Sequence, residues 1–184
     1  MVNYILSLDT SIEQALYVAR DPFLVQAFTW ITWLGEVFVV LGLTAAVAIV
    51  LAYRKQWAPM AGIITSVIGS AAVTYILKEL VARPRPPMGI PTHLETGFSF
   101  PSGHATFVIA FYGFMLYLMW EKLTPMQRKI KTVAVGIIVL AVGFSRLYLG
   151  VHYPTDVLAG FLAGGVFVWL GILISRRFSP SKSS

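Results

Sequence analysis

Five stretches of apolar residues, separated by short polar segments, dominate this chain of 184 residues. They run over residues 37–53, 58–77, 105–120, 132–144 and 157–175. A helix needs roughly 20 mainly apolar residues to cross the hydrocarbon core of a bilayer, and several of these stretches approach that length. We therefore expect an all-α protein, a polytopic membrane helical bundle with five transmembrane helices, formed by a single domain over residues 1–184.

The N-terminal residues 1–34 are mixed in character and predict helices of another kind. Asp9–Glu13 is typical of a capped helix start with an acid in the first turn. Residues 23–33 are aromatic and apolar but too short to span a bilayer alone. We expect 1–34 to form an interfacial, amphipathic segment anchored by its tryptophans. In the alternative, 23–33 continue into the next stretch as one long tilted helix, although Gly35–Glu36 would be unfavourable in its interior.

Proline, glycine and charge mark the connections between the apolar stretches. Residues 83–101 are rich in proline, which interrupts helices, and we expect a loop there. Residues 121–131 form a basic loop, and the basic tail 176–184 should be frayed. In the last apolar stretch, Gly160 and Gly164 have the small-xxx-small spacing that lets two helices pack closely.

The composition supports a membrane protein. Of all residues, 57% are hydrophobic and 12% are charged, which is about half the charged share of soluble domains. The absence of cysteine excludes disulfides and thiolate metal sites. The net charge of +6 would suit nucleic acid, but its distribution argues against that partner. Nine cations flank the apolar stretches, the pattern that sets membrane orientation: Arg54, Lys55, Lys122, Arg128, Lys129, Lys131, Arg176, Arg177 and Lys182.

Five spans place these nine cations and the C-terminus on the cytoplasmic side of the cell membrane. Four further cations then lie on the extracytoplasmic side, against the orientation rule: Lys78, Arg83, Arg85 and Arg146. They share that side with His104, His152 and Asp156. Charged groups in or beside membrane spans are costly and tend to mark function. We therefore expect a functional site on the extracytoplasmic face.

The first segment on that face offers groups that bind anions. Ser102 can cap the helix that follows it, Gly103 lets the backbone approach a ligand, and the free N–H groups of a helix start attract negative charge. Taken alone, Ser102 also suits an ordinary turn before a helix, and Lys78 at the end of a span also suits contact with lipid headgroups. Arg83 and Arg85 alternate with prolines, so their side chains point to opposite sides, and spacing does not choose between them.

The second segment brings a histidine and a carboxylate together. Gly150 loosens the end of one span, and Pro154 suits the first turn of the next helix, where its missing N–H costs nothing. His152 then lies just before that helix, with Asp156 in its first turn. The Asp156 carboxylate can reach back to a ring nitrogen of His152, which fixes the tautomer and raises the basicity of the other nitrogen.

Several cations, a helix N-terminus and two histidines suit a phosphate or diphosphate substrate. One histidine can attack phosphorus while the other protonates the leaving oxygen. A metal site is the rival use of these histidines and of Asp156. The surrounding cations oppose it, and only His93 offers a further ligand. We therefore expect no metal.

Three blocks of residues resemble a known family. They are Lys78 followed after six residues by Arg85-Pro86; Pro101-Ser102-Gly103-His104; and Ser145-Arg146 followed after five residues by His152 and after three more by Asp156. This pattern is similar to the three-part signature of the type 2 phosphatidic acid phosphatase (PAP2) family, the lipid phosphate phosphatases. The match is complete, in the right order, and spans residues 78–156. Arg85, and not Arg83, matches the family pattern.

The resemblance implies a role for each matched residue. The residues that bind the phosphate oxygens would be Lys78, Arg85 and Arg146, helped by Ser102 and Gly103. His152 would attack phosphorus and form a phosphohistidine, with Asp156 orienting it and balancing its charge. His104 would protonate the leaving lipid oxygen and then activate water. The family uses no metal and no other cofactor.

The resemblance also implies a function and one departure from the family. Membrane relatives commonly have six spans, whereas we expect five unless residues 23–34 form part of a sixth. The implied activity is hydrolysis of a membrane lipid phosphate or diphosphate, and we favour undecaprenyl or another isoprenyl diphosphate. Phosphatidylglycerophosphate or phosphatidate is the alternative. A transporter or flippase for an anionic lipid is an alternative of another class, and the oligomeric state stays open.

Overall fold

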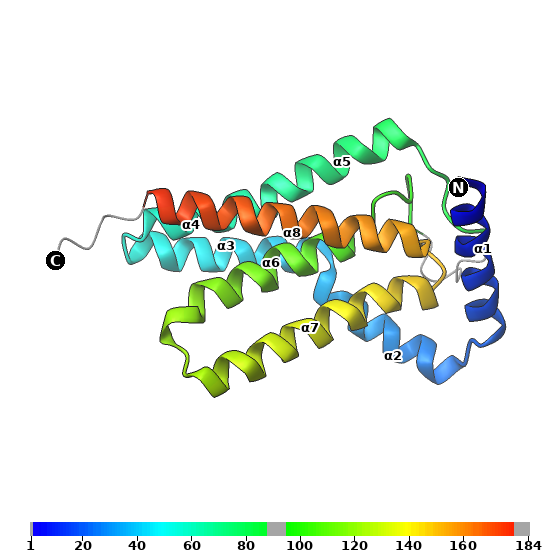
Figure 1. Cartoon of the computed structure of the whole chain (residues 1–184), viewed down its shortest axis with the longest axis horizontal. Helices are drawn as coiled ribbons and strands as arrows, with labels where there is room; N and C mark the ends of the chain where they lie inside the picture. The colour runs from blue at the N-terminus through cyan, green and yellow to red at the C-terminus, as the bar shows by residue number, and fades with distance from the viewer. Residues whose placement is uncertain (1, 88–94, 179–184) are drawn as a thin grey trace.

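The computed structural model describes residues 2–87 and 95–178, and every secondary-structure element within these ranges is helical (Figure 1). In chain order the elements are α1 (Val2–Val18), α2 (Pro22–Thr32), η1 (Trp33–Gly35), α3 (Val37–Tyr53), α4 (Trp57–Ile64), η2 (Thr65–Gly69), α5 (Ser70–Val81), α6 (Gly103–Met119), η4 (Trp120–Lys122), α7 (Pro125–Tyr148) and α8 (Pro154–Arg177). Five stretches are long and apolar enough to cross a membrane: Pro22–Tyr53, Trp57–Val81, Gly103–Lys122, Pro125–Tyr148 and Pro154–Arg177. The predicted all-α bundle with five spans is confirmed.

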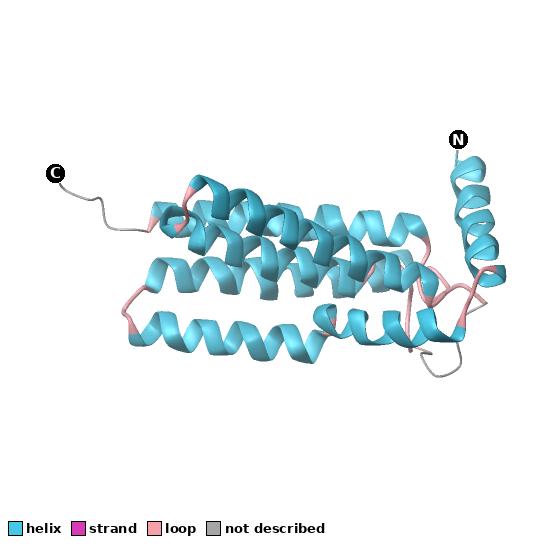
Figure 2. Cartoon of the chain, turned by 90° about the horizontal axis from the view of Figure 1, so that it is seen from below, coloured by secondary structure: helices cyan, strands magenta, loops and turns pink. Residues whose placement is uncertain are grey.

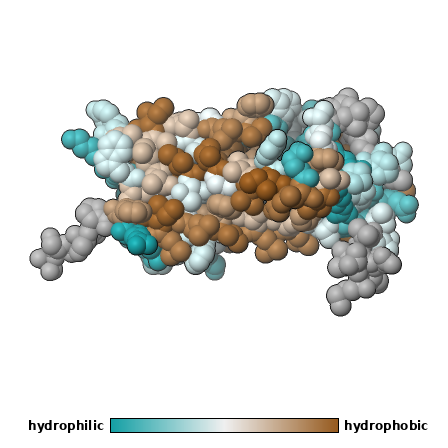
Figure 3. All heavy atoms as spheres, turned by 90° about the horizontal axis from the view of Figure 1, so that it is seen from above, coloured by the Kyte–Doolittle hydropathy of each residue, from teal (hydrophilic) through white to brown (hydrophobic). Residues whose placement is uncertain are grey.

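The spanning helices run side by side, and α1 lies across one end of the bundle (Figures 1 and 2). The turn between α7 and α8 lies at the α1 end, whereas α8 ends at the opposite end, near the turn that joins α3 to α4. Apolar side chains cover the middle of the face seen in Figure 3, and polar ones gather toward both ends. This arrangement separates the basic connections from the candidate site, as the charge pattern predicts.

Helix α6 packs most extensively against α8, and two glycines set their distance. A Cβ atom at Gly160 would lie 2.6 Å from the backbone oxygen of Ser102, and one at Gly164 would lie 2.6 Å from that of Thr106. Real Cβ atoms do not come this close to an oxygen, so both positions need glycine. The predicted small-xxx-small contact is therefore present, and it joins the two helices that begin at the candidate site.

The N-terminal third differs from its expected form. Residues 22–32 pack lengthwise along α7, where Phe28 lies 4.8 Å from Tyr148 between ring centroids, and they continue into α3. The expectation of a separate interfacial segment is therefore wrong for α2, and the alternative of a joined span is closer. The join is a break and not a straight helix, because η1 ends at Gly35 and the Glu36 carboxylate caps α3. Glycine is needed at this break, because a Cβ at Gly35 would lie 2.8 Å from Val142 in α7. Helix α1 alone has the transverse direction of an interfacial helix.

Two further helices begin at other residues than the sequence predicts. Asp9 does not begin a helix but lies inside α1, where its carboxylate contacts other elements. Helix α7 begins at Pro125, earlier than the predicted residue 132, because Thr124 and Gln127 form a capping box. By contrast, Ser102 caps α6, and α8 begins at Pro154, as predicted.

The second span contains an irregular turn. Thr65–Gly69 forms a π-helical turn between α4 and α5. The Ser66 hydroxyl in this turn donates a hydrogen bond of 2.7 Å to the backbone oxygen of Ala110 in α6. Such turns are rare and frequently accompany functional sites. Beyond it, α5 carries Lys78 toward the α1 end of the bundle.

Candidate active site

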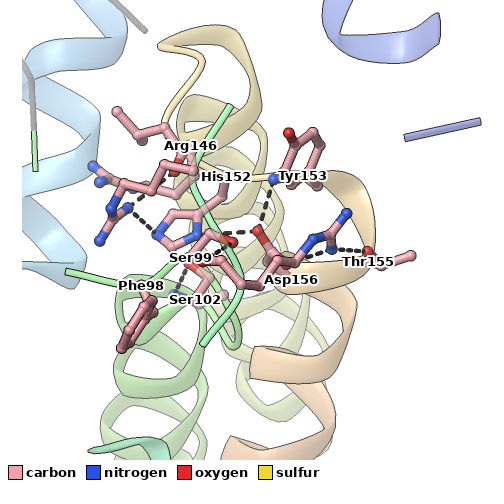
Figure 4. Close-up of polar contacts among 12 residues, drawn as sticks. Phe98, Ser99, Ser102, Arg146, His152, Tyr153, Thr155 and Asp156 are labelled. Carbon is pink, nitrogen blue, oxygen red and sulfur yellow. Dashed lines mark hydrogen bonds and ion pairs between the residues drawn. The ribbon is translucent and has the colours of Figure 1, made fainter. Parts of the chain in front are cut away.

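Two chain segments meet at the α1 end of the bundle, and a backbone hydrogen bond ties them together. The Ser102 N–H, at the start of α6, donates to the backbone oxygen of Asp156, in the first turn of α8, at 3.0 Å. Gly150 supplies the turn before α8 with a φ of 70°, which glycine adopts without strain. Figure 4 shows the side chains of His152 and Asp156 coming together beside Ser102. The structure therefore brings the second and third motif blocks together.

His152 lies in the centre of this site and is 2% exposed. Its Nε2 atom lies 3.2 Å from Nη1 of Arg85, and its Nδ1 atom lies 3.5 Å from Oδ2 of Asp156. Burial, and then the charges of Arg146 and Arg85, hold the pKa of His152 well below its ordinary value of 6.5. The imidazole is therefore neutral at physiological pH. The predicted contact with Asp156 exists, although 3.5 Å is longer than a good hydrogen bond.

Three cations, two from helices and one from the connection between α5 and α6, lie near His152. The Lys78 ammonium of α5 donates to the backbone oxygen of Phe98 at 2.5 Å. Arg85 donates to the backbone oxygen of Val151 at 2.9 Å, and burial lowers its pKa below the ordinary value of a guanidinium. Arg146 of α7 is 2% exposed and donates to the Thr32 hydroxyl at 2.7 Å. These three cations are the ones that the motif pattern singled out.

A carboxylate that the sequence analysis did not consider lies among these cations. Glu95 forms ion pairs with Arg146 and, at 3.1 Å, with Nη2 of Arg85. Its oxygens also lie 3.8 Å from Nε2 of His152 and 3.9 Å from Nδ1 of His104. An anionic group at this point is thus within reach of two arginines and both histidines.

His104 faces the cations from the first turn of α6. Its Nε2 donates a hydrogen bond of 3.0 Å to Oε2 of Glu36, because a carboxylate can only accept. Its Nδ1 is thereby directed toward Glu95 and the cations. Sequence reasoning treated Glu36 only as an obstacle to a continuous helix. An acid within an apolar stretch is itself a signal of function, and that signal could have identified this contact.

Arg83 and Arg85 occupy opposite sides of the site, as their alternation predicts. Arg85 faces His152, in agreement with the motif pattern. Arg83 lies behind Asp156, where its guanidinium contacts Asp156 and Asp9 at 2.7 Å each. The sequence predicted Arg83 among the extracytoplasmic cations and Asp9 in a helix start, but not that they contact each other or Asp156.

Two cavities open onto the site. The larger, of about 500 Å³, lies between α3, α5 and α6 and is lined by Lys78, Arg85 and His104 together with apolar side chains. The smaller, of about 470 Å³, lies beside η1, α3 and α7 and reaches Arg146 and His104. Ser102 uses its hydroxyl to cap α6, while Gly103 lines the larger cavity. Space for an apolar chain therefore adjoins the cations.

The described residues contain no group of three or more histidine, aspartate or glutamate side chains arranged to hold a metal ion. His93, the further ligand considered from the sequence, lies outside the described residues. The arrangement that the structure does contain is suited to an anion. It joins buried cations to one neutral histidine and a second histidine backed by a carboxylate.

Several known proteins are similar to this chain in sequence and in fold. The model of the PAP2 superfamily matches residues 59–180. Phosphatidylglycerophosphatase B of Bacillus subtilis (strain 168) is 36% identical over 172 residues, covering 91% of this chain and 83% of the relative. A crystal structure of a transmembrane PAP2-type phosphatidylglycerolphosphate phosphatase from Bacillus subtilis superimposes with a TM-score of 0.88 and 31% identity, covering 98% of this chain and 90% of that one.

A shorter match involves a protein of different named activity. YbjG of Escherichia coli (strain K12), a candidate undecaprenyl-diphosphatase by name, is 35% identical over 72 residues, covering 39% of this chain and 32% of the relative. The family match includes more than half of the chain, and the resemblance inferred from the three motif blocks is confirmed. The chain therefore belongs to the PAP2 superfamily, and it is a membrane lipid phosphatase of that family.

Proposed function

We propose that this enzyme hydrolyses the phosphate monoester of a membrane glycerophospholipid, above all phosphatidylglycerophosphate, through a phosphohistidine at His152. One observation carries the proposal: Nε2 of a buried, neutral His152 lies 3.2 Å from Arg85, beside two further cations. Phosphatidylglycerophosphate, the alternative substrate in the sequence analysis, is better supported than undecaprenyl diphosphate, which was favoured there. A phosphatidylglycerophosphatase matches 91% of this chain, whereas the undecaprenyl-diphosphatase match covers 39%.

In the first step, Nε2 of neutral His152 attacks phosphorus, and the phosphorus–nitrogen bond forms as the bond to the lipid oxygen breaks. His104 gives its Nδ1 proton to that leaving oxygen, so the lipid departs as an alcohol. The charge on the non-bridging oxygens is stabilised by Lys78, Arg85 and Arg146. The phosphate displaces the Glu95 carboxylate, because two anions cannot share these cations.

In the second step, water attacks the phosphohistidine. His104, now neutral at Nδ1, accepts a proton from the water as the new phosphorus–oxygen bond forms. The phosphorus–nitrogen bond breaks, inorganic phosphate leaves, and His152 is again neutral. Proton and charge balance over the cycle without a metal, in keeping with the absence of cofactors in the family.

The remaining motif residues support these steps. The Asp156 carboxylate faces Nδ1 of His152 and favours the tautomer with the proton on Nδ1, which leaves the Nε2 lone pair free to attack phosphorus. Ser102 caps α6 and so directs the free N–H groups of its first turn toward the anion, and Gly103 leaves room for the phosphate. The distribution of loop cations supports an extracytoplasmic active site in the cell membrane, with the C-terminus in the cytoplasm.

Phosphate release from a lipid panel tests the substrate. The purified protein in detergent, with excess EDTA, is assayed with phosphatidylglycerophosphate, phosphatidate and undecaprenyl diphosphate, each over a range of concentrations. We expect the highest kcat/KM for phosphatidylglycerophosphate and no effect of the chelator. A higher kcat/KM for undecaprenyl diphosphate would overturn the substrate assignment, and loss of activity with EDTA would overturn the metal-free reaction.

The covalent step needs a separate test. Rapid quenching under alkaline conditions, with substrate labelled in the phosphate, should trap label on the wild-type protein and none on His152→Ala. His104→Ala should slow both formation and hydrolysis of the phosphoenzyme. Wild-type turnover by His152→Ala would refute the assignment of the nucleophile.

A further inference from the structure

Arg83 joins the transverse helix α1 to the carboxylate behind the nucleophile. Its Nη2 atom lies 2.7 Å from Oδ2 of Asp9 in α1, and its Nη1 atom lies 2.7 Å from Oδ1 of Asp156 in α8. We infer that Arg83 and Asp9 are positioning residues, through which α1 holds Asp156 and thereby His152 in the orientation needed for attack on phosphorus. This inference rests on the proposed role of His152.

The burial of both carboxylates explains why Arg83 is required. Asp9 is 2% exposed and Asp156 is fully buried. A buried carboxylate without a partner is strongly unfavourable, and one that loses its cation shifts position or takes up a proton. Arg83 is the only cation of the described residues in an ion pair with either of them. Removing its charge therefore leaves two buried anions near each other.

The surroundings of Arg83 hold its guanidinium in one place. The guanidinium carbon lies 4.0 Å from the ring centroid of Tyr153, and Nη1 also donates to the Thr155 hydroxyl at 2.7 Å. The backbone oxygen of Arg83 accepts a hydrogen bond of 2.8 Å from the Ser99 N–H. Burial works to lower the pKa of Arg83, but the bond to Asp9 and the charge of Asp156 outweigh it, so the pKa is raised and the group stays charged.

Asp9 binds the start of α8 at two further points. Its Oδ1 atom accepts a hydrogen bond of 3.1 Å from the Thr155 N–H, and its Oδ2 atom accepts one of 2.5 Å from the Thr155 hydroxyl. The first of these satisfies a backbone donor in the first turn of α8, which has no partner within the helix. A side chain of α1 therefore acts as a cap for the helix that carries Asp156.

The two oxygens of Asp156 are thus held by different groups. Oδ1 binds Arg83, while Oδ2 accepts a hydrogen bond of 2.9 Å from the Tyr153 N–H and faces Nδ1 of His152 at 3.5 Å. Rotation of the carboxylate would break the bond to Arg83. Arg83 thereby fixes the direction in which Oδ2 meets the histidine ring, and α1 fixes Arg83.

Substitutions at Arg83 and Asp9 test the inference in the full-length protein in detergent. We expect Arg83→Met to lower kcat and the rate of phosphoenzyme formation about 10- to 100-fold, by analogy with the range for groups that orient metal-binding histidines. KM should change less than about threefold, because neither residue touches the substrate. Arg83→Lys should restore part of the loss. Asp9→Asn, which is nearly isosteric, should lower kcat about 3- to 10-fold, and the double variant should be little worse than Arg83→Met.

Tyr148→Phe is the matched control. The Tyr148 hydroxyl accepts a bond of 2.8 Å from the Asp21 N–H and donates one of 3.0 Å to the backbone oxygen of Ala19. It therefore anchors the connection between α1 and α2 without touching Asp156. We expect Tyr148→Phe to shorten the half-life of the protein in warm detergent as Asp9→Asn does, while kcat stays within about twofold of the wild type, since no partner of the histidine is lost.

The outcomes separate this inference from the proposed function. Wild-type kcat in both Arg83→Met and Asp9→Asn would overturn the inference, and so would an equal fall of kcat in Tyr148→Phe. Should Arg83→Met fail to accumulate, Asp9→Asn and Arg83→Lys decide by the same criteria. His152→Ala, measured in parallel, should form no phosphoenzyme. If it turns over normally, the proposed function fails whatever the Arg83 variants do.

Discussion

Replacing Gly160 by alanine adds a methyl group where α6 and α8 leave no space for one. The added Cβ would lie 2.6 Å from the Ser102 backbone oxygen and 2.9 Å from Cβ of Ala105, whereas ordinary contact begins at 3.4 Å. The two helices must therefore separate by about 0.8 Å at the point where the active-site segments meet. Overpacking of this kind costs about 1–3 kcal/mol of unfolding free energy.

Gly165 provides the matched control because it lies on the same helix with nothing within 4 Å of its added Cβ. Both variants gain about 1 kcal/mol from the higher helix propensity of alanine. The difference between them is therefore the overpacking alone, about 1–3 kcal/mol, or about 2–4 °C in Tm for each kcal/mol. Thermal unfolding in one detergent, followed by tryptophan fluorescence, should give a lower Tm for Gly160→Ala than for Gly165→Ala.

Activity adds a second measurement on the same pair. Separation of α6 from α8 moves His104 away from His152, and a displacement near 1 Å can reduce turnover about 100-fold. We expect Gly160→Ala to lose at least about tenfold in kcat, since its displacement is slightly smaller, while Gly165→Ala keeps wild-type turnover. Equal Tm values and equal kcat values for the two variants would show that this helix contact sets neither stability nor geometry.

The remaining predictions concern three ionisable residues of the site, Arg146, His152 and Glu36. Arg146→Lys keeps the charge but loses the planar fork, and kcat should fall about 100-fold in a phosphate-release assay; a fall below threefold would contradict the role of the guanidinium. Because the pKa of His152 lies well below 6.5, its ¹⁵N resonances should report a neutral ring at pH 6, and a midpoint near 6.5 would be inconsistent with burial. The same depressed pKa means that the unfolded chain binds more protons, so this histidine's contribution to stability is present above pH 6.5 and is lost as the pH falls toward the folded pKa. Glu36→Gln should lower kcat about tenfold by removing the charge beside His104, which steady-state turnover at several pH values would measure; unchanged profiles would exclude that role.

Local sequence patterns predicted those features whose causes are local. The apolar stretches indicated five spans, Ser102 and Pro154 marked two helix starts, and Gly160 marked a close helix contact. Each of these depends on residue types within a few positions, which a single sequence displays. The choice of Arg85 over Arg83 as the cation facing His152 came instead from the resemblance to the family signature.

The partners of the matched residues could not be predicted in the same way. Glu36 meets His104 across 68 positions of the chain, and Asp9 meets Arg83 across 74. Neither pair has a spacing that a helix or strand period would reveal, because their approach depends on how the spans pack. Asp9 instead suggested a helix cap, the commoner local use of an aspartate before an apolar run.

The π-helical turn at residues 65–69 determines the direction in which the Lys78 side chain leaves α5. Its wider turn holds one residue more than the regular helix, and each residue of an α-helix corresponds to roughly 100° of rotation. If residues 65–69 formed a regular helix with no residue removed, α5 would turn by that angle, and Thr74 and Lys78 would leave the cavity that they line. Deleting one residue of the turn should instead restore a regular helix and leave Lys78 facing the site. A one-residue deletion there should therefore keep more activity than a one-residue insertion, which adds a rotation that the turn does not absorb.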